Sequence, residues 1–195
     1  KFYYEKILGQ PKKFYKLRRP RGEKKLPRVI DQQELLGKII TIPNLKHKTI
    51  LTLAYSVGLR VSEIVNLKIV DIDSKRMLIN INNAKGRKDR IVPLSETVLK
   101  LLRFYYIEYK PKEYLFNGQK SLQYSIGSCQ AIYKQYIDTK TSIHNLRHSS
   151  FTHLLENGTD LRLIQKIAGH SSVKTTEIYT HVSNKLLSQV QLPIW

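Results

Sequence analysis

The spacing of apolar residues follows a helical period over most of the chain after residue 30. Asp31 stands three residues before Glu34, a pattern typical of a capping box, and apolar residues at helical spacing follow it. The same period, with Gly158 and Gly169 at two of the expected helix ends, predicts further helices. These cover residues 47–56, a segment from 60, a segment from 95, and residues 121–136, 144–156, 161–168 and 173–182.

The pattern changes between residues 69 and 94. Three short segments, 69–72, 77–81 and 90–94, show partly alternating apolar and polar residues, which predicts three strands. The polar stretch 82–89 predicts the turn between the last two strands. The expected fold is therefore mainly α with a small three-stranded antiparallel sheet.

The first 30 residues differ in composition from the rest of the chain. They hold eleven Lys and Arg residues but only two acidic ones, Glu5 and Glu23. We interpret residues 2–8 as the end of a helix, followed by an extended basic linker and then a compact domain. The charge density of the linker favours contact with a nucleic-acid backbone over an inert spacer.

The overall charge indicates what kind of partner the protein binds. The formal net charge is +19, from 34 Lys and Arg against 15 Asp and Glu. A polyanionic partner relieves such self-repulsion, so nucleic acid is favoured over an anionic membrane surface, with an RNA-binding or ribosomal protein as an alternative. Cys129 is the only cysteine and lies in an apolar helical stretch, which excludes an internal disulfide and predicts a buried thiol. The sequence has no secretory signal and no apolar run long enough to cross a membrane, which favours a cytoplasmic protein.

Two short motifs contain the residue types of a phosphodiester site. His144 and Arg147 are three residues apart at the start of a predicted helix, so they share a face. An arginine provides a fixed cationic fork, and a histidine can move protons, although such a pair taken alone is more often two solvated surface residues than a catalytic pair. Arg60 follows the turn residue Gly58 and begins another helix, where the helix dipole is already positive, so an anion site explains it better than a structural role. Glu63, one turn further on, can orient Arg60.

Three further residues are candidates that their local pattern alone does not single out. Lys85 lies in the predicted hairpin turn, where an ordinary solvated lysine is the simpler explanation. His170 follows Gly169 at the end of a short predicted helix. Tyr179 lies nine residues later, but the chain has 12 tyrosines and a core tyrosine is equally compatible with this position.

Taken together, the motifs resemble one family in their order and spacing. GLRVSE, AKGRKDRIVPL, HNLRH and LIQKIAGHSSVKTTEIYTHV resemble the tyrosine recombinases, also called phage-type integrases, from about Lys24 to Val182. The resemblance implies that residues 24–195 are a catalytic domain with a C-terminal tail, and that residues 1–23 are the end of a core-binding domain and a basic linker. It also implies six catalytic residues: Arg60, Lys85, His144, Arg147, His170 and Tyr179.

The resemblance implies a site-specific DNA recombinase that cleaves and rejoins strands through a 3′-phosphotyrosyl ester on Tyr179, without ATP or a cofactor. The two arginines would bind nonbridging phosphate oxygens, and Lys85 would protonate the leaving 5′ oxygen. His144 would accept the tyrosine proton, and His170 would donate to a phosphate oxygen. The six histidines lack HExxH spacing and there is no acidic cluster for magnesium, so no metal site is expected.

The implied partner is double-stranded DNA, bound by a homotetramer in the cytoplasm at the nucleoid, with accessory directionality proteins as further partners. The apolar residues 183–195 would dock on a neighbouring protomer or fold back on their own domain. Two alternatives stay open: a DNA-binding protein of this fold without strand exchange, and a nicking-closing enzyme of the type IB topoisomerase kind. An integrase of a mobile element and a chromosome-dimer resolvase share these motifs.

Overall fold

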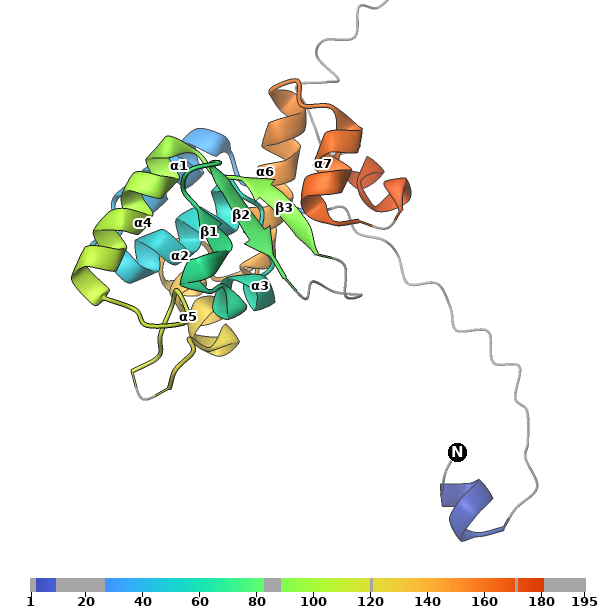
Figure 1. Cartoon of the computed structure of the whole chain (residues 1–195). Coiled ribbons are helices and arrows are strands. Elements are labelled where there is room, and N and C mark those ends of the chain that lie inside the picture. Colours follow the sequence, from blue (N-terminus) through green and yellow to red (C-terminus); the bar gives the residue numbers. More distant parts are fainter. Residues whose placement is uncertain (1–2, 10–26, 83–88, 120, 171, 181–195) are drawn as a thin grey trace, which may run out of the picture.

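A computed structural model describes residues 3–9, 27–82, 89–119, 121–170 and 172–180 of the chain (Figure 1). Most of these residues belong to helices gathered around one core, with a small sheet on one side. The α-helices are α1 (Gln32–Ile40), α2 (Leu45–Ser56), α3 (Val61–Asn66), α4 (Glu96–Tyr109), α5 (Ile126–Tyr136), α6 (His144–Glu156) and α7 (Leu161–Ala168). The predicted mainly helical class is confirmed.

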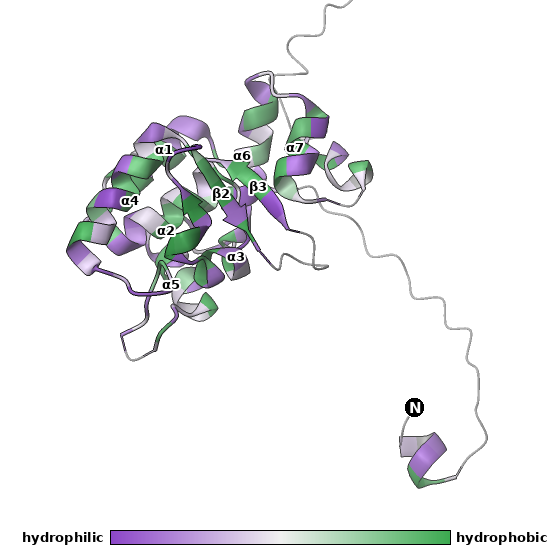
Figure 2. Ribbon diagram, in the orientation of Figure 1, coloured by the Kyte–Doolittle hydropathy of each residue, from purple (hydrophilic) through white to green (hydrophobic). Residues whose placement is uncertain are grey.

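Helix α2 is the centre of the core. It packs against α1, α4, α5 and α6, and its middle residues are buried on nearly every side. Figure 2 shows the apolar residues of the surrounding helices on the sides that face this core. The predicted buried thiol of Cys129 is confirmed, and burial raises the pKa of that thiol to about 12. No helix in the described part of the chain has the length and apolar character needed to cross a membrane.

The sheet contains β1 (Ile72–Asp73), β2 (Leu78–Ile81) and β3 (Arg90–Pro93), all antiparallel and in sequence order. Leu78 pairs with Pro93 and Ile81 pairs with Arg90. The predicted three strands are thus present, and β3 lies beside α7 (Figure 1).

The first of these strands was predicted too early in the chain. Residues Ile69–Asp71 form a 3-10 helix, and only Ile72–Asp73 are extended. The Asp71 carboxylate accepts a hydrogen bond from the Lys68 backbone N–H at 2.8 Å, which stabilises the tight turn. A local side-chain bond therefore overrides the alternating pattern.

The helix ends follow their capping side chains. The Asp31 carboxylate caps α1 as predicted, while Glu34 pairs with Lys38 at 2.6 Å. Helices α6 and α7 have the predicted bounds. The helix predicted over 121–136 begins only at Ile126, because the Ser125 hydroxyl caps it there.

The last described segment is not the single helix predicted over 173–182. It forms two 3-10 turns, Val173–Thr175 and Glu177–Tyr179, and residues from 181 onward lie outside the described part. The Thr176 side chain between the turns is buried and faces the His170 ring. Near the other end, Tyr3–Ile7 form a π-helical turn within the predicted helix end.

Two neighbouring isoleucines of α1 test this core. Ile39 is 4% exposed and Ile40 is 66% exposed. Ile39→Ala should lower the free energy of unfolding by about 2 to 4 kcal/mol, because it leaves a cavity under α2. Ile40→Ala should change it by less than about 0.5 kcal/mol. Urea denaturation followed by circular dichroism measures both, and equal losses would contradict this packing.

Candidate active site

Arg147 of α6 lies at the centre of the site. Arg147 is only 1% exposed. Its Nη1 donates to the backbone carbonyl of Gly58, and its Nη2 donates to that of Ala168. Its guanidinium carbon lies 4.7 Å from the centroid of the Phe151 ring. Burial and the charge of Arg60 lower the pKa of Arg147 to about 9, which leaves it charged at neutral pH. A fixed cation therefore joins α6 to the turn before α3 and to the end of α7.

Arg60 is the N-cap residue of α3, and Glu63 holds it. The Glu63 carboxylate accepts the Arg60 backbone N–H and the Arg60 Nη1, each at 2.8 Å. It also accepts both Nη atoms of Arg90, each at 2.7 Å. Burial alone would raise the pKa of Glu63, but the hydrogen bonds and charges of Arg90 and Arg60 lower it to about 2. Glu63 therefore stays ionised and orients Arg60, in agreement with the predicted orienting role.

Arg90 is the residue of this group that the sequence analysis missed. Within β3 and the residue after it, Val92 and Leu94 are buried and Ile91 is exposed, so Arg90 stands in the core-facing register. A charged residue in that register predicts a buried ion pair, and this was the available signal. Its partner Glu63 lies 27 positions earlier, and periodicity does not reveal such a pairing.

His170 follows α7 and is held at both ring nitrogens. Its Nε2 lies 3.3 Å from Nη2 of Arg147, and its Nδ1 lies 3.0 Å from the Thr176 hydroxyl. Arginine can only donate, so Nε2 accepts and Nδ1 carries the proton of the neutral ring. Burial and the charges of Arg147 and Arg60 lower the pKa of His170 to about 4. In this tautomer Nε2 of His170 accepts from Arg147, so Nε2 must gain a proton before it can make the predicted donation to a phosphate oxygen.

His144 is the first residue of α6 and is exposed. Its ring stands edge-on to that of His148, with the centroids 4.6 Å apart. Desolvation and the charges of Arg147 and Arg60 lower the pKa of His144, so it is neutral at pH 7. A neutral, accessible imidazole can accept a proton.

Tyr179 is 1% exposed and packs against three rings of the site. Its ring is stacked on His170 at 6.4 Å and lies 5.5 Å from Phe151 and 5.9 Å from His148, between centroids. Burial raises the pKa of Tyr179, while the charges of Arg147 and Arg60 act in the opposite direction. The phenol is therefore protonated at neutral pH.

The structure thus brings five of the six candidate residues together: Arg60, His144, Arg147, His170 and Tyr179. Their catalytic roles stay predictions. Lys85, the sixth, lies outside the described residues. The described residues hold no group of three or more His, Cys, Asp or Glu side chains arranged to bind a metal ion.

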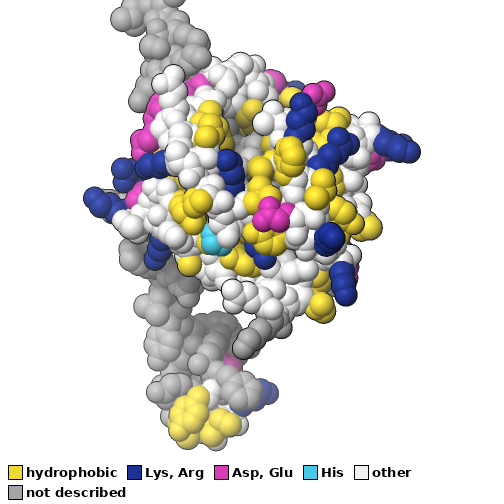
Figure 3. Space-filling model, turned by 90° about the vertical axis from the view of Figure 1, so that its left-hand side faces the viewer, with side chains coloured by type: hydrophobic (Ala, Val, Ile, Leu, Met, Phe, Trp, Pro, Cys, Tyr) yellow, Lys and Arg dark blue, Asp and Glu magenta, His cyan; other side chains and the backbone are white. Residues whose placement is uncertain are grey.

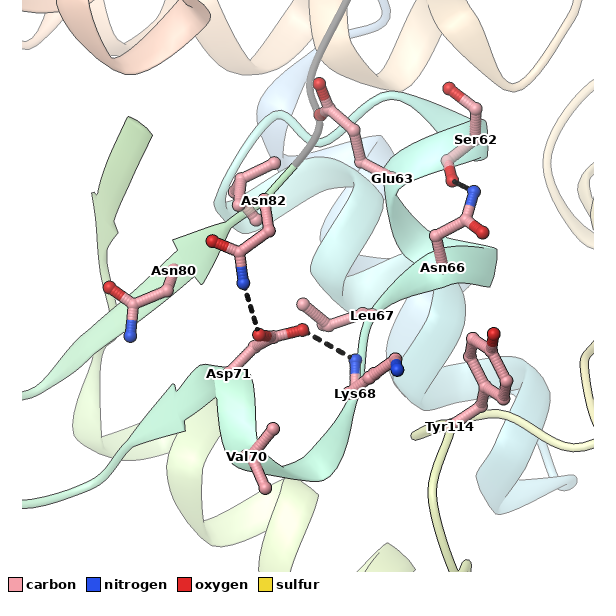
Figure 4. A pocket seen from close by; sticks show the side chains of 11 residues that line it. Ser62, Glu63, Asn66, Leu67, Lys68, Val70, Asp71, Asn80, Asn82 and Tyr114 are labelled. Carbon is pink, nitrogen blue, oxygen red and sulfur yellow. Dashed lines mark hydrogen bonds between the residues drawn. The ribbon is translucent and has the colours of Figure 1, made fainter. Parts of the chain in front are cut away.

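A cavity of about 550 Å³ opens beside α3, and Glu63 is among the residues that line it (Figure 4). Its walls carry amide and acidic groups, among them Asn66, Asn80, Asn82 and Asp71. The Asp71 carboxylate there accepts the Asn82 amide at 2.7 Å, in addition to the Lys68 backbone N–H. Acidic groups in these walls disfavour a phosphate, so the arginine cluster is a better candidate for an anion site than this cavity.

The face of the molecule that carries α4 has a different surface composition. Figure 3 shows apolar side chains gathered among Lys and Arg on this face. Phe104 and Ile107 are among the exposed apolar residues of α4. None of the candidate catalytic residues belongs to this helix.

Known proteins match both the sequence and the fold. A family model described as the phage integrase family matches residues 29–185. A tyrosine recombinase XerA of Pyrococcus horikoshii is 35% identical over 193 residues, which cover 95% of this chain and 68% of that protein.

Solved structures agree with this match. A crystal structure of XerA recombinase shares 30% identity with a TM-score of 0.75, over 88% of this chain and 65% of that one. A post-cleavage complex of the XerH site-specific recombinase with palindromic difH substrate shares 28% identity with a TM-score of 0.75, over 85% of this chain and 52% of that one. The chain therefore spans about half to two thirds of the solved chains. Its sequence and its fold together show that it belongs to the phage integrase family, the tyrosine site-specific recombinases.

Proposed function

We propose that this chain cleaves and rejoins DNA strands through a covalent bond between the Tyr179 oxygen and a 3′ phosphate. The observation that carries the proposal is the cluster itself. Two arginines, two neutral histidines and a tyrosine meet at one place, although their positions run from residue 60 to residue 179. The family match supports the same chemistry.

The arginines would bind the scissile phosphate. Arg60 keeps part of its side chain accessible while Glu63 fixes its direction. Nη1 of Arg147 has a second hydrogen beyond the one given to the Gly58 carbonyl, so a donor remains for a phosphate oxygen, while both hydrogens of Nη2 are given to the Ala168 carbonyl and His170. Fixed donors of this kind stabilise the charge of a pentacoordinate phosphorus better than water does.

The reaction exchanges one phosphate ester for another. The Tyr179 oxygen attacks phosphorus, and the bond to the 5′ oxygen of the next nucleotide breaks. His144 accepts the phenol proton, for which its lowered pKa keeps a free nitrogen available. Lys85, assigned by the family resemblance, gives a proton to the leaving 5′ oxygen. Attack of a 5′ hydroxyl reverses these steps and releases Tyr179, so joining needs no ATP.

The proposed partner is double-stranded DNA, which the net charge of +19 favours. The XerH structure is a complex with a DNA substrate, which supports this choice. Residues 24–195 would form the catalytic domain and residues 1–23 the end of a core-binding domain with its linker. A homotetramer on two DNA sites, accessory directionality proteins and a place at the cytoplasmic nucleoid complete the proposal.

A selection experiment tests the function whatever the sequence of the DNA target. The chain is incubated with nicked duplexes of randomised sequence, in which the released strand diffuses away and traps the cleaved state. Adducts that survive SDS are recovered and sequenced. Enriched duplexes that are also joined to a second duplex indicate recombination. When the enriched sequences are supplied again as intact supercoiled circles, relaxation without joining indicates a nicking-closing enzyme, and binding without adducts indicates a DNA-binding protein.

Tyr179→Phe should abolish the covalent adduct and leave DNA binding within about twofold. The substitution removes one oxygen and keeps the ring that packs on His170 and Phe151. Denaturing gels measure the adduct, and fluorescence anisotropy measures binding. Tyr136→Phe, a change on the half-buried face of α5, is the matched control and should keep the adduct. An adduct formed by the Tyr179 variant would refute the proposed nucleophile.

Lys85→Ala should slow cleavage of ordinary DNA by about a hundredfold, because the leaving oxygen loses its acid. A substrate with sulfur in place of the 5′ bridging oxygen should restore most of the rate, since a thiolate leaves without a proton. Single-turnover rates on the two substrates give the comparison. An equal defect on both would mean that Lys85 is not the general acid.

The pH dependence should report the base. His144 acts only when neutral, and its pKa lies below the ordinary 6.5. The second-order rate constant at limiting DNA should therefore be level around pH 7 and fall about tenfold for each pH unit below that pKa. His144→Gln should remove this dependence along with most of the rate. A rate that rises as the pH falls from 7 to 5 would contradict the role of His144 as the proton acceptor.

A further inference from the structure

Arg90 is a buried cation with no part in the steps described above. Its side chain is only 6% exposed, although it belongs to an edge strand of a small sheet. Three of its donor atoms bind within the site: Nη1 and Nη2 to Glu63, and Nε to the Ile167 carbonyl, each at 2.7 Å. Burying a guanidinium is strongly unfavourable unless it is paired this completely. The position thus joins three elements, β3, α3 and α7.

The first connection runs through Glu63 to Arg60. Oε1 of Glu63 accepts one bond from each arginine, at 2.8 Å from Arg60 and 2.7 Å from Arg90. Oε2 likewise accepts the Arg60 backbone N–H and the second Nη of Arg90. Each oxygen is therefore shared, and Arg60 gives the carboxylate only one of its five side-chain hydrogens.

The charge of this triad explains why the sharing matters. Arg60, Glu63 and Arg90 together carry +1, whereas Arg60 and Glu63 alone carry zero. Without Arg90, the ionised Glu63 would draw the whole Arg60 fork into a bidentate pair, the preferred geometry of an isolated arginine and carboxylate. Arg60 would then be turned away from a phosphate and the site would lose its net charge.

The second connection runs to the end of α7. Arg90 donates to the carbonyl of Ile167 and Arg147 donates to that of Ala168, so two cations cap the negative end of one helix. Gly169 follows with a φ of +64°, and a Cβ there would lie 3.0 Å from Cδ of Arg90. The backbone that carries His170 is therefore packed directly on the Arg90 side chain.

We propose that Arg90 is a positioning residue for DNA strand cleavage, which keeps Arg60 directed at the scissile phosphate by sharing Glu63 and fixes the His170 segment by capping α7. The inference rests on the proposed function above. Arg90 does not touch the DNA in this scheme. It acts through Glu63 and through the Ile167 carbonyl.

The main test replaces Arg90 with methionine, which keeps a similar length and removes the donors. Arg90→Met should slow adduct formation by about a hundredfold, the usual effect of displacing a catalytic group by about 1 Å. Arg76→Met is the matched control, because Arg76 lies in the turn before β2 with its side chain 80% exposed. It should keep the wild-type rate within about twofold.

A double variant separates positioning from mere loss of stability. Glu63→Gln combined with Arg90→Met removes both opposite charges and leaves Arg60 unpaired, so the net charge returns to +1. The double variant should cleave about tenfold faster than Arg90→Met alone, even though two buried groups are now altered. If Arg90 had only a structural role, the double variant would cleave more slowly than Arg90→Met alone. Thermal unfolding of each variant gives the folded fraction by which rates are corrected.

A modified substrate gives a second discriminating result. A methylphosphonate at the scissile position removes the phosphate charge that Arg60 is proposed to neutralise. The ratio of wild-type to Arg90→Met rates should fall at least tenfold on this substrate, in parallel with the ratio for Arg60→Met. A purely structural defect would give the same ratio on both substrates. Equal ratios, or an Arg90→Met rate within threefold of wild type, would overturn the proposal.

Binding of inorganic phosphate tests the positioning role of Arg90 separately from the proposed DNA-cleaving function. NMR titration should show about tenfold weaker phosphate binding by Arg90→Met than by the wild-type chain, consistent with loss of a charge-assisted interaction. If the wild-type chain forms no adduct with any duplex, the proposed function fails, and this titration still decides whether Arg90 sustains the anion site. Unchanged phosphate affinity in Arg90→Met would contradict the proposed positioning role of Arg90.

Discussion

The site depends on how the fold accommodates the buried charge of Arg147. Removing a guanidinium from water costs several kcal/mol unless nearly all its donors find acceptors. Here the acceptors are two backbone carbonyls, of Gly58 and Ala168, and Nε2 of His170, with the Phe151 ring beneath the cation. The first carbonyl lies two residues before Arg60, and the second lies two residues before His170. The bonds that make Arg147 tolerable in the interior therefore also set its distance from the other two phosphate-binding candidates.

Two glycines make this arrangement sterically feasible. Gly58 has a φ of +64°, and a Cβ at that position would lie 2.7 Å from the Phe151 ring. Gly169 has the same φ and ends α7 immediately after Ala168. A left-handed residue reverses the chain within one step, which gives both segments the turn that leaves a carbonyl facing Arg147. The packing around Arg147 therefore requires glycine at positions 58 and 169. These two glycines shape the site as much as its charged residues do.

The sequence predicts those parts of the structure that local rules determine. The bounds of α6 and α7 follow from apolar periodicity and from residues such as Asp160, whose carboxylate caps α7. The segments at 69–72 and 173–182 were assigned wrongly, because Asp71 and Thr176 form side-chain hydrogen bonds that periodicity does not register. Tyr179 was chosen among 12 tyrosines only through the family resemblance. Arg90 was missed because its importance lies entirely in a partner from another element.

The charge balance of the site bears on its chemistry. Three arginines face one carboxylate, and their field, together with burial, keeps His144 and His170 neutral. A phosphate diester placed between the arginines cancels part of this field, so it raises the pKa of a nearby histidine. Linkage requires the reverse as well: a histidine that gains a proton binds the phosphate more tightly. The proposed proton transfer from Tyr179 to His144 is thus unfavourable in the free protein, where the phenol is buried and neutral. It becomes more favourable only when a phosphate is bound. In the proposed mechanism the same cluster of cations would therefore select the anion and delay the activation of Tyr179 until the anion is present.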